Sequence, residues 1–146
     1  NSAARAITDR WQEPGHYVKL EREEGSIDFI VAVQQTDLAP WRYEFKGRSI
    51  PVDEPAEILA KKLKYRSSGI VPRDIFDLLA IHHFDPEIVK EAVAAVPDGA
   101  RRAADRIRRI GKRYRETIKD EVNPTANGAE LLEVDPIEAA EILLPH

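Results

Sequence analysis

The sequence of 146 residues contains no cysteine and no methionine. The absence of cysteine excludes disulfide frameworks, thiolate zinc sites and cysteine nucleophiles. Nothing in the chain therefore argues for an oxidising compartment, and we expect a cytoplasmic protein. Because the chain begins with Asn1 and has no methionine, we also expect that residues precede it in the native protein.

Long apolar runs are missing as well. The longest uncharged apolar stretch covers residues 29–33, far short of the roughly 20 residues that cross a bilayer. The first residues do not have the pattern of a signal peptide. A Gly-rich phosphate loop and a serine elbow are also absent, which argues against several common enzyme classes. We therefore expect a soluble protein with no membrane partner.

What the sequence does contain fits an ordinary globular domain. A chain of this length can bury a core without disulfides or a structural metal. The formal net charge of −4 at pH 7 gives no overall attraction to nucleic acid, so the local distribution of charge matters more than its sum.

The first third of the chain, residues 1–52, is rich in β-forming residues. Short segments of branched and aromatic side chains alternate with turn signals, which predicts pairs of antiparallel strands. The predicted strands are residues 16–20, 27–33, 41–45 and 49–52.

From residue 53 onward the apolar period changes to that of helices. Asp53 and Glu54 are expected to cap the first helix, and Pro55 suits its first turn. The longest helix carries eight basic residues around an apolar stripe of Ala103, Ile107 and similar residues, and an acidic helix at the end of the chain can pack against it. The predicted helices are residues 53–66, 72–85, 86–95, 100–120 and 136–144.

The expected fold class is therefore α+β, with a small antiparallel β-hairpin sheet followed by a helical half. We expect one compact domain in three parts. These are a β-rich part in residues 1–52, a helical part in residues 53–121, and a linker with the acidic helix in residues 122–146.

Asp28 is the first candidate for chemistry, because it interrupts the apolar segment SIDFIVAV. A carboxylate that projects from a rigid strand is a suitable ligand for Mg²⁺ in phosphoryl transfer. The alternative is a half-buried strand with Asp28 on its wet face beside Ser26 and Ile30. The strand by itself favours this alternative.

A second candidate is the lysine-rich helix. Lys62 and Arg66 are four residues apart, so they share a helix edge and can bind one anion. Lys61 lies four residues after Glu57, and we interpret that pair as ordinary surface support. For any single lysine, a solvated surface position is the simpler interpretation.

The third candidate is the segment PRDIFDLL, in which Asp74 and Asp77 are one turn apart near the start of a helix. The helix dipole favours an aspartate in the first turn for structural reasons, and salt bridges to the preceding helix compete with a catalytic role. His82 and His83 follow, but adjacent residues of a helix point about 100° apart and make a poor shared metal site.

Taken together, the segments SIDFIV, VDEPAEILAKKLKYR and PRDIFDLLAI resemble the later motifs of the AbiEii/AbiGii family of nucleotidyltransferase toxins. The resemblance covers residues 17–81. It implies a polymerase-β-like fold and Mg²⁺-dependent transfer of a nucleotidyl group from a nucleoside triphosphate to an acceptor such as RNA. It also implies a cognate antitoxin protein in a bacterial toxin–antitoxin or phage-defence pair.

The resemblance assigns roles to particular residues. Asp28 matches the carboxylate that completes the metal site. Lys62, with Lys61 next, matches the lysine that contacts the triphosphate, and Arg66 is a further candidate for binding it.

Arg73, Asp74 and Asp77 match the Arg-Asp-x-x-Asp motif, in which the first aspartate is essential and the second orients its neighbours. Arg73 is also a candidate for binding the nucleotide. The family's earlier motif, a Gly-Ser followed by two spaced acidic residues, does not occur in the chain. Either the sequence is part of a longer protein, or it is a reduced relative without catalysis.

Two other interpretations remain open. The basic helix of residues 100–120 can bind nucleic-acid phosphates in a non-catalytic binding module, and the tail of residues 130–144 can bind a protein partner. A solvated amphipathic helix that the acidic tail neutralises is the plainest interpretation of the basic segment taken alone.

Overall fold

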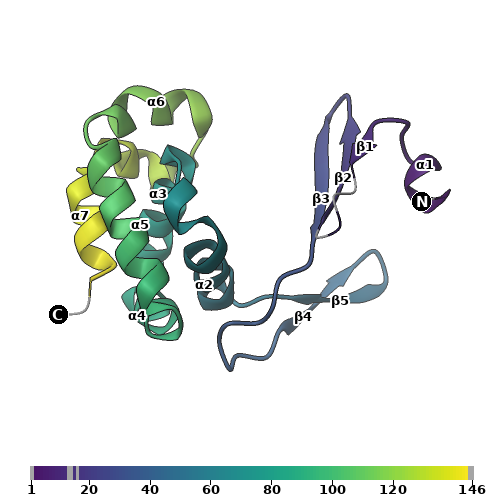
Figure 1. Ribbon diagram of the computed structural model, residues 1–146, viewed down its shortest axis with the longest axis horizontal. Helices are drawn as coiled ribbons and strands as arrows, with labels where there is room; N and C mark the ends of the chain where they lie inside the picture. The colour runs from purple at the N-terminus through teal and green to yellow at the C-terminus, as the bar shows by residue number, and fades with distance from the viewer. Residues whose placement is uncertain (1, 13–14, 16, 145–146) are drawn as a thin grey trace. The chain divides into compact units, whose positions relative to one another are not determined.

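The computed structural model describes residues 2–12, 15 and 17–144 of the chain. Its internal contacts divide the chain into two units, Asn1–Val33 and Gln34–His146. Figure 1 shows strands in the earlier part of the chain and helices in the later part, so the predicted α+β class is confirmed. The second hairpin belongs to the unit that also contains the helices, whereas the sequence grouped it with the first hairpin.

The first unit is a small antiparallel sheet. It contains helix α1 (Ser2–Arg5) and the strands β1 (Trp11–Gln12), β2 (Tyr17–Arg22) and β3 (Gly25–Ile30), in the spatial order β1-β2-β3. The predicted hairpin is confirmed, and its register places Lys19 opposite Asp28. The strand does not continue through residues 31–33, and His16, which the sequence placed in the first strand, lies outside the described residues.

The sheet of the first unit has very little core. Leu20 is the one buried side chain among the described residues of this unit. Every residue of β3 is exposed, including Ile27, Phe29 and Ile30. The buried core of the protein therefore lies in the second unit.

The second unit begins with another hairpin, formed by β4 (Trp41–Phe45) and β5 (Arg48–Val52). Its two turn residues, Lys46 and Gly47, both have positive φ, at 49° and 73°. Two consecutive positive φ values are the signature of the tight turn whose twist matches that of paired strands. The predicted strand pair around Lys46 and Gly47 is confirmed.

Helices make up the rest of the second unit. Proline occupies the first position of α2, α3, α4, α5 and α7, where its missing N–H costs no hydrogen bond. The helices are α2 (Pro55–Arg66), η1 (Ser67–Gly69), α3 (Pro72–Phe84), α4 (Pro86–Ala95), α5 (Pro97–Ile110), α6 (Arg113–Glu121), η2 (Ala126–Glu133) and α7 (Pro136–Ile142). In the described part of the chain, none of them is both long and apolar enough to cross a membrane.

Helix α5 lies at the centre of this unit and packs against α2, α4, α7 and η1. Its predicted apolar stripe is confirmed, and Tyr114 and Ile118 of α6 extend it. Ala100 and Ala104 of α5 and Ala139 and Ala140 of α7 are all fully buried. The predicted packing of the last helix on the basic helix is therefore confirmed, with small side chains buried on both helices.

The single helix predicted for residues 100–120 is wrong in two ways. It starts earlier, because Pro97, Asp98 and Gly99 form the first turn of α5 instead of a closing turn. It is also interrupted at Gly111, whose φ of 51° and ψ of −136° are far from helical values. Only glycine adopts such a conformation readily, so Gly111 separates α5 from α6.

The expected cap of α2 is also wrong. Glu54 occupies the cap position, but its side chain makes no capping hydrogen bond. Asp53 instead accepts a hydrogen bond from Lys61. Proline at the first position lowers the need for a cap, because one of the unpaired helix-start donors is missing.

Candidate functional site

An ion-pair cluster joins the last two turns of α2 to the first two turns of α3. Lys62 Nζ lies 3.0 Å from Asp74 Oδ1 and also donates to Asp77 Oδ2. Arg66 Nη2 lies 3.2 Å from Asp74 Oδ2. We name Lys62, Arg66, Asp74 and Asp77 the Lys62 cluster. The structure thus brings together residues that the sequence identified in two separate motifs.

Local helix geometry places these four side chains. Lys62 and Arg66 are four residues apart on α2, and Asp74 and Asp77 are three apart on α3, so each pair occupies one helix face. The short helix η1 and two further residues connect the two helices. The sequence prediction that Lys62 and Arg66 bind one anion is met by a protein group, the Asp74 carboxylate.

Burial differs sharply within the Lys62 cluster. The Asp74 side chain is 1% exposed, Lys62 is 23% exposed, and Asp77 and Arg66 are 41% and 45% exposed. Asp74 Oδ2 also accepts a hydrogen bond of 3.3 Å from the backbone N–H of Val71. A buried carboxylate requires such partners to offset its lost hydration. Asp74 therefore lies at the base of the cluster, with both cations reaching toward solvent.

Both cations of the cluster have N–H donors that the two carboxylates do not use. A lysine has three N–H donors and an arginine has five, and the contacts to Asp74 and Asp77 occupy two of those on Lys62 and one on Arg66. Asp74 fixes both cations in place. The remaining donors suit oxygens of a phosphate chain.

Arg73 and Lys61 lie outside the Lys62 cluster. Arg73 is exposed and makes no ion pair within the described part of the chain. Lys61 Nζ lies 2.6 Å from Asp53 Oδ2 and 3.2 Å from Glu57 Oε1. Both are predicted nucleotide-binding residues, and neither forms an ion pair with Asp74.

Glu57 is a buried polar residue that the sequence interpretation missed. Its side chain is 2% exposed, so the view of the Glu57–Lys61 pair as surface support is wrong. The carboxylate accepts hydrogen bonds from the backbone N–H groups of Gln35 and Thr36, at 3.0 and 2.8 Å, and from Thr36 Oγ1 at 2.8 Å. The only local signal is its position beside the apolar stripe of α2, because its partners are more than 20 residues away.

These contacts shift the pKa of both members of the pair. Burial raises the pKa of Glu57, but the hydrogen bonds from Thr36, Gln35 and Lys61 outweigh it and hold the pKa below its usual range. The hydrogen bond to Asp53 is the main reason that the pKa of Lys61 lies above its usual range. Both groups are therefore charged at neutral pH, and Glu57 anchors residues 35–36 to α2.

Asp28 lies on β3 in the first unit, opposite Lys19. Its side chain is exposed, as are Ser26 and Ile30 on the same face. Mg²⁺ in phosphoryl-transfer sites is commonly held by one or two carboxylates together with substrate phosphates and water. Among the described residues, no group of three or more acidic, histidine or cysteine side chains is placed to hold a metal ion. Asp28 supplies one carboxylate of the kind that such a Mg²⁺ site requires.

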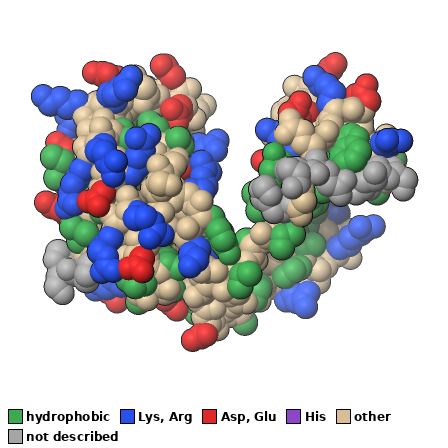
Figure 2. Space-filling model, viewed as in Figure 1, with side chains coloured by type: hydrophobic (Ala, Val, Ile, Leu, Met, Phe, Trp, Pro, Cys, Tyr) green, Lys and Arg blue, Asp and Glu red, His purple; other side chains and the backbone are tan. Residues whose placement is uncertain are grey.

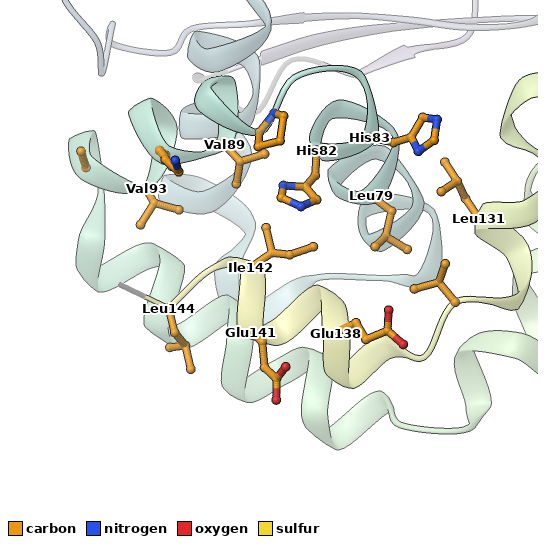
Figure 3. A pocket seen from close by; sticks show the side chains of 14 residues that line it. Leu79, His82, His83, Val89, Val93, Leu131, Glu138, Glu141, Ile142 and Leu144 are labelled. Atoms are coloured by element: carbon orange, nitrogen blue, oxygen red, sulfur yellow. The ribbon is translucent and has the colours of Figure 1, made fainter. Parts of the chain in front are cut away.

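A cavity of about 770 Å³ lies among α3, α4, η2 and α7 and contains no residue of the Lys62 cluster. Its wall is mostly apolar, and His82 points into it (Figure 3). His82 Nδ1 is buried without a hydrogen-bond partner in the described part of the chain. His83 also lines the cavity, and its Nε2 atom lies 3.8 Å from Glu130 Oε1.

The relation of this site to known proteins was tested by three comparisons. No family model, curated protein or solved structure matches the chain. The resemblance of residues 17–81 to AbiEii/AbiGii toxins therefore stays a hypothesis. It depends on the motif residues alone.

Proposed function

We propose that this chain is the later part of an AbiEii-like nucleotidyltransferase. The observation that supports this proposal best is the Lys62 cluster. Lys62 and Arg66, two partly exposed cations, converge on the buried carboxylate of Asp74, and these residues come from the lysine motif and the Arg-Asp-x-x-Asp motif of the resemblance. Such a pair of fixed cations suits the triphosphate of a nucleotide substrate.

In the proposed reaction, a hydroxyl oxygen of the acceptor attacks the α-phosphorus of a nucleoside triphosphate and loses its proton to water. The new bond joins that oxygen to the nucleotidyl group, the bond to the β-phosphate oxygen breaks, and pyrophosphate leaves. Lys62 and Arg66 bind the phosphates and stabilise the charge that develops on the leaving group. Asp74 is a positioning residue that holds both cations, and Asp77 orients Lys62.

Asp28 is the residue that we propose as a ligand of Mg²⁺. Asp74 and Asp77 are less suited to this task, because their carboxylates already bind Lys62 and Arg66. An RNA acceptor and a cognate antitoxin belong to the same proposal, and they are supported by the resemblance alone. A cytoplasmic location also belongs to it, and it is supported by the absence of cysteine.

A transfer assay with two labelled substrates tests this proposal. The native protein is incubated with Mg²⁺, an RNA pool and a nucleoside triphosphate labelled at either the α- or the γ-phosphate. We expect the α label to appear in RNA and the γ label to appear in pyrophosphate. Label in neither product, with all four nucleotides tested, would contradict a nucleotidyltransferase.

The alternative interpretation is that the Lys62 cluster has a structural role alone and holds α2 against α3. Under that interpretation, Asp77→Asn changes the free energy of unfolding and the protein has no transfer activity to lose. Under the proposal, Asp77→Asn lowers the transfer rate more than it lowers stability, because Asp77 is partly exposed and orients a substrate-binding lysine.

A further inference from the structure

A second basic site lies where η1 meets α5. A cavity of about 170 Å³ there is lined by Ser68, Arg102, Asp105, Arg106 and Arg109. Water occupies about 30 Å³ per molecule in the liquid. The cavity therefore has room for a small oxyanion together with a few water molecules.

The three arginines belong to one face of α5. Their spacing of four and then three residues places them in a row along the helix. Arg102 Nε donates to Ser67 Oγ at 3.2 Å, and Arg109 Nε donates to the backbone carbonyl of Asp105 at 3.2 Å. Both contacts use Nε, so they fix the guanidinium groups while leaving the terminal Nη groups for a ligand.

Arg106 is the least exposed of the three arginines. Its Nε atom is buried and has no hydrogen-bond partner within the described residues. Arg106 also forms no ion pair among them. A buried donor on a charged group is costly when it lacks an acceptor. Because that atom is inaccessible to solvent, a ligand in the cavity would bind the terminal Nη groups of Arg106.

The charge of the cavity selects an anion. Three of its five lining residues are arginines, and the carboxylate of the single aspartate, Asp105, pairs with Arg108 outside the cavity at 3.4 Å. Figure 2 shows Lys and Arg side chains gathered over α5 on this face of the helical unit. The guanidinium fork matches the oxygens of a phosphate group, and the Ser68 hydroxyl adds a neutral donor.

We propose that this cavity, the Arg106 pocket, binds a phosphate group. The group is either a phosphate of a single-stranded nucleic acid or free inorganic phosphate, because both present the same tetrahedral oxygens. The residues of the Arg106 pocket are distinct from those of the Lys62 cluster, so the proposal does not depend on the nucleotidyltransferase reaction.

The test compares two single-charge variants of the full chain at low ionic strength. Isothermal titration calorimetry measures binding of inorganic phosphate and of a short single-stranded RNA. Arg106→Gln is expected to weaken binding about tenfold or more, the loss of a charge-assisted hydrogen bond. Arg113→Gln is the matched control, because Arg113 is exposed on α6 and does not line the pocket. We expect it to change the affinity by less than about twofold.

Inorganic phosphate and RNA, the two probes, distinguish a free-phosphate site from a nucleic-acid site. Tight RNA binding that inorganic phosphate displaces only weakly identifies a nucleic-acid site, and its affinity should fall steeply with salt. Binding of inorganic phosphate without RNA binding identifies a free-phosphate site. The proposal is wrong if neither probe binds, or if Arg106→Gln and Arg113→Gln reduce binding equally.

Two further variants control for a folding defect and for binding at the Lys62 cluster. Ser68→Asp places a negative charge at the pocket and should weaken binding as strongly as Arg106→Gln. It provides a second test of the pocket if Arg106→Gln alters folding. Arg66→Gln reports any binding of the two probes at the Lys62 cluster, because Arg66 belongs to that cluster. Loss of binding in Arg66→Gln, with full binding in Ser68→Asp, would assign the phosphate to the Lys62 cluster and overturn the Arg106 pocket.

Discussion

At the scale of single residues, Asp74 determines the geometry of the Lys62 cluster. Its carboxylate is nearly inaccessible to solvent and binds Lys62, Arg66 and the backbone N–H of Val71. Each of these contacts offsets part of the cost of burying a charge. The same carboxylate therefore stabilises the contact between α2 and α3 and positions the two cations.

We predict that Asp74→Asn lowers the free energy of unfolding by about 3 kcal/mol. The substitution keeps the shape of the side chain but removes the charge that balances Lys62 and Arg66. Urea unfolding measures the effect. Asp77→Asn is the matched control and should cost less than about 1 kcal/mol, because a largely solvated pair contributes little. Equal losses in the two variants would contradict the central position of Asp74.

Gly99 is required by the close approach of the backbones of α5 and α2. A Cβ atom at this position would lie 2.4 Å from the carbonyl oxygen of Leu63, in the backbone of α2. The start of α5 therefore packs directly on α2, and no side chain fits between them.

Gly99→Ala should destabilise the protein by about 1–3 kcal/mol through this overlap, although alanine favours helices more than glycine does. Gly69→Ala is the control, because a Cβ there meets nothing within 4 Å. Thermal unfolding of the two variants measures the difference. A stabilising effect of Gly99→Ala would show that α5 can move away from α2 at little cost.

At the scale of elements, Glu57 fastens the segment before β4 to α2. Its pKa in the folded state is below the unfolded value, so its contribution to stability is present above the unfolded pKa and is lost as the pH falls through the folded pKa. Lys61 behaves in the opposite sense. Its raised pKa keeps its contribution intact below the unfolded pKa, and this is lost as the pH rises through the folded pKa.

We predict that Glu57→Gln costs about 3 kcal/mol at pH 7, because it leaves buried donors with a poorer acceptor. The difference from wild type should shrink as the pH is lowered below the unfolded pKa of the glutamate, as measured by denaturant unfolding from pH 7 to pH 3. Glu91→Gln, at an exposed position on α4, should cost little at any pH. A pH-independent difference for Glu57→Gln would contradict a charged Glu57.

The positions of most elements follow directly from the sequence. Proline at the first helical position and glycine in the turns mark boundaries that the structure reproduces, and the apolar stripe of α5 and α6 is correct. The break at Gly111 was missed because the stripe continues across it. The partners of Glu57 were missed because hydrogen bonds to a distant loop have no local pattern.

The candidate site was only partly predictable for a related reason. Spacing placed Lys62 with Arg66 and Asp74 with Asp77, since these pairs depend on one helix each. Whether the two pairs meet depends on how η1 connects the helices. The sequence offered the basic helix as a candidate for binding nucleic-acid phosphates, with a solvated face as the plainest interpretation. The Arg106 pocket itself was not predicted, because nothing in the sequence showed that Ser68 lies beside these arginines.

At the scale of the whole molecule, the buried core is almost entirely in residues 34–146. We predict that a fragment of these residues folds without the first unit, and that it keeps the helical circular dichroism signal and a cooperative thermal transition. The Glu57 contacts to Gln35 and Thr36 are retained in it. A fragment without a cooperative transition would show that the helical unit requires residues 1–33.

The most direct test of the proposed function is Mg²⁺-dependent binding of a nucleoside triphosphate to the native protein. Equilibrium dialysis compares wild type with Arg66→Gln and with Lys64→Gln, an exposed control on the same helix. We predict that wild type and Lys64→Gln bind alike and that Arg66→Gln binds about tenfold more weakly. Absence of binding in wild type, or equal weakening in both variants, would contradict a triphosphate site at the Lys62 cluster.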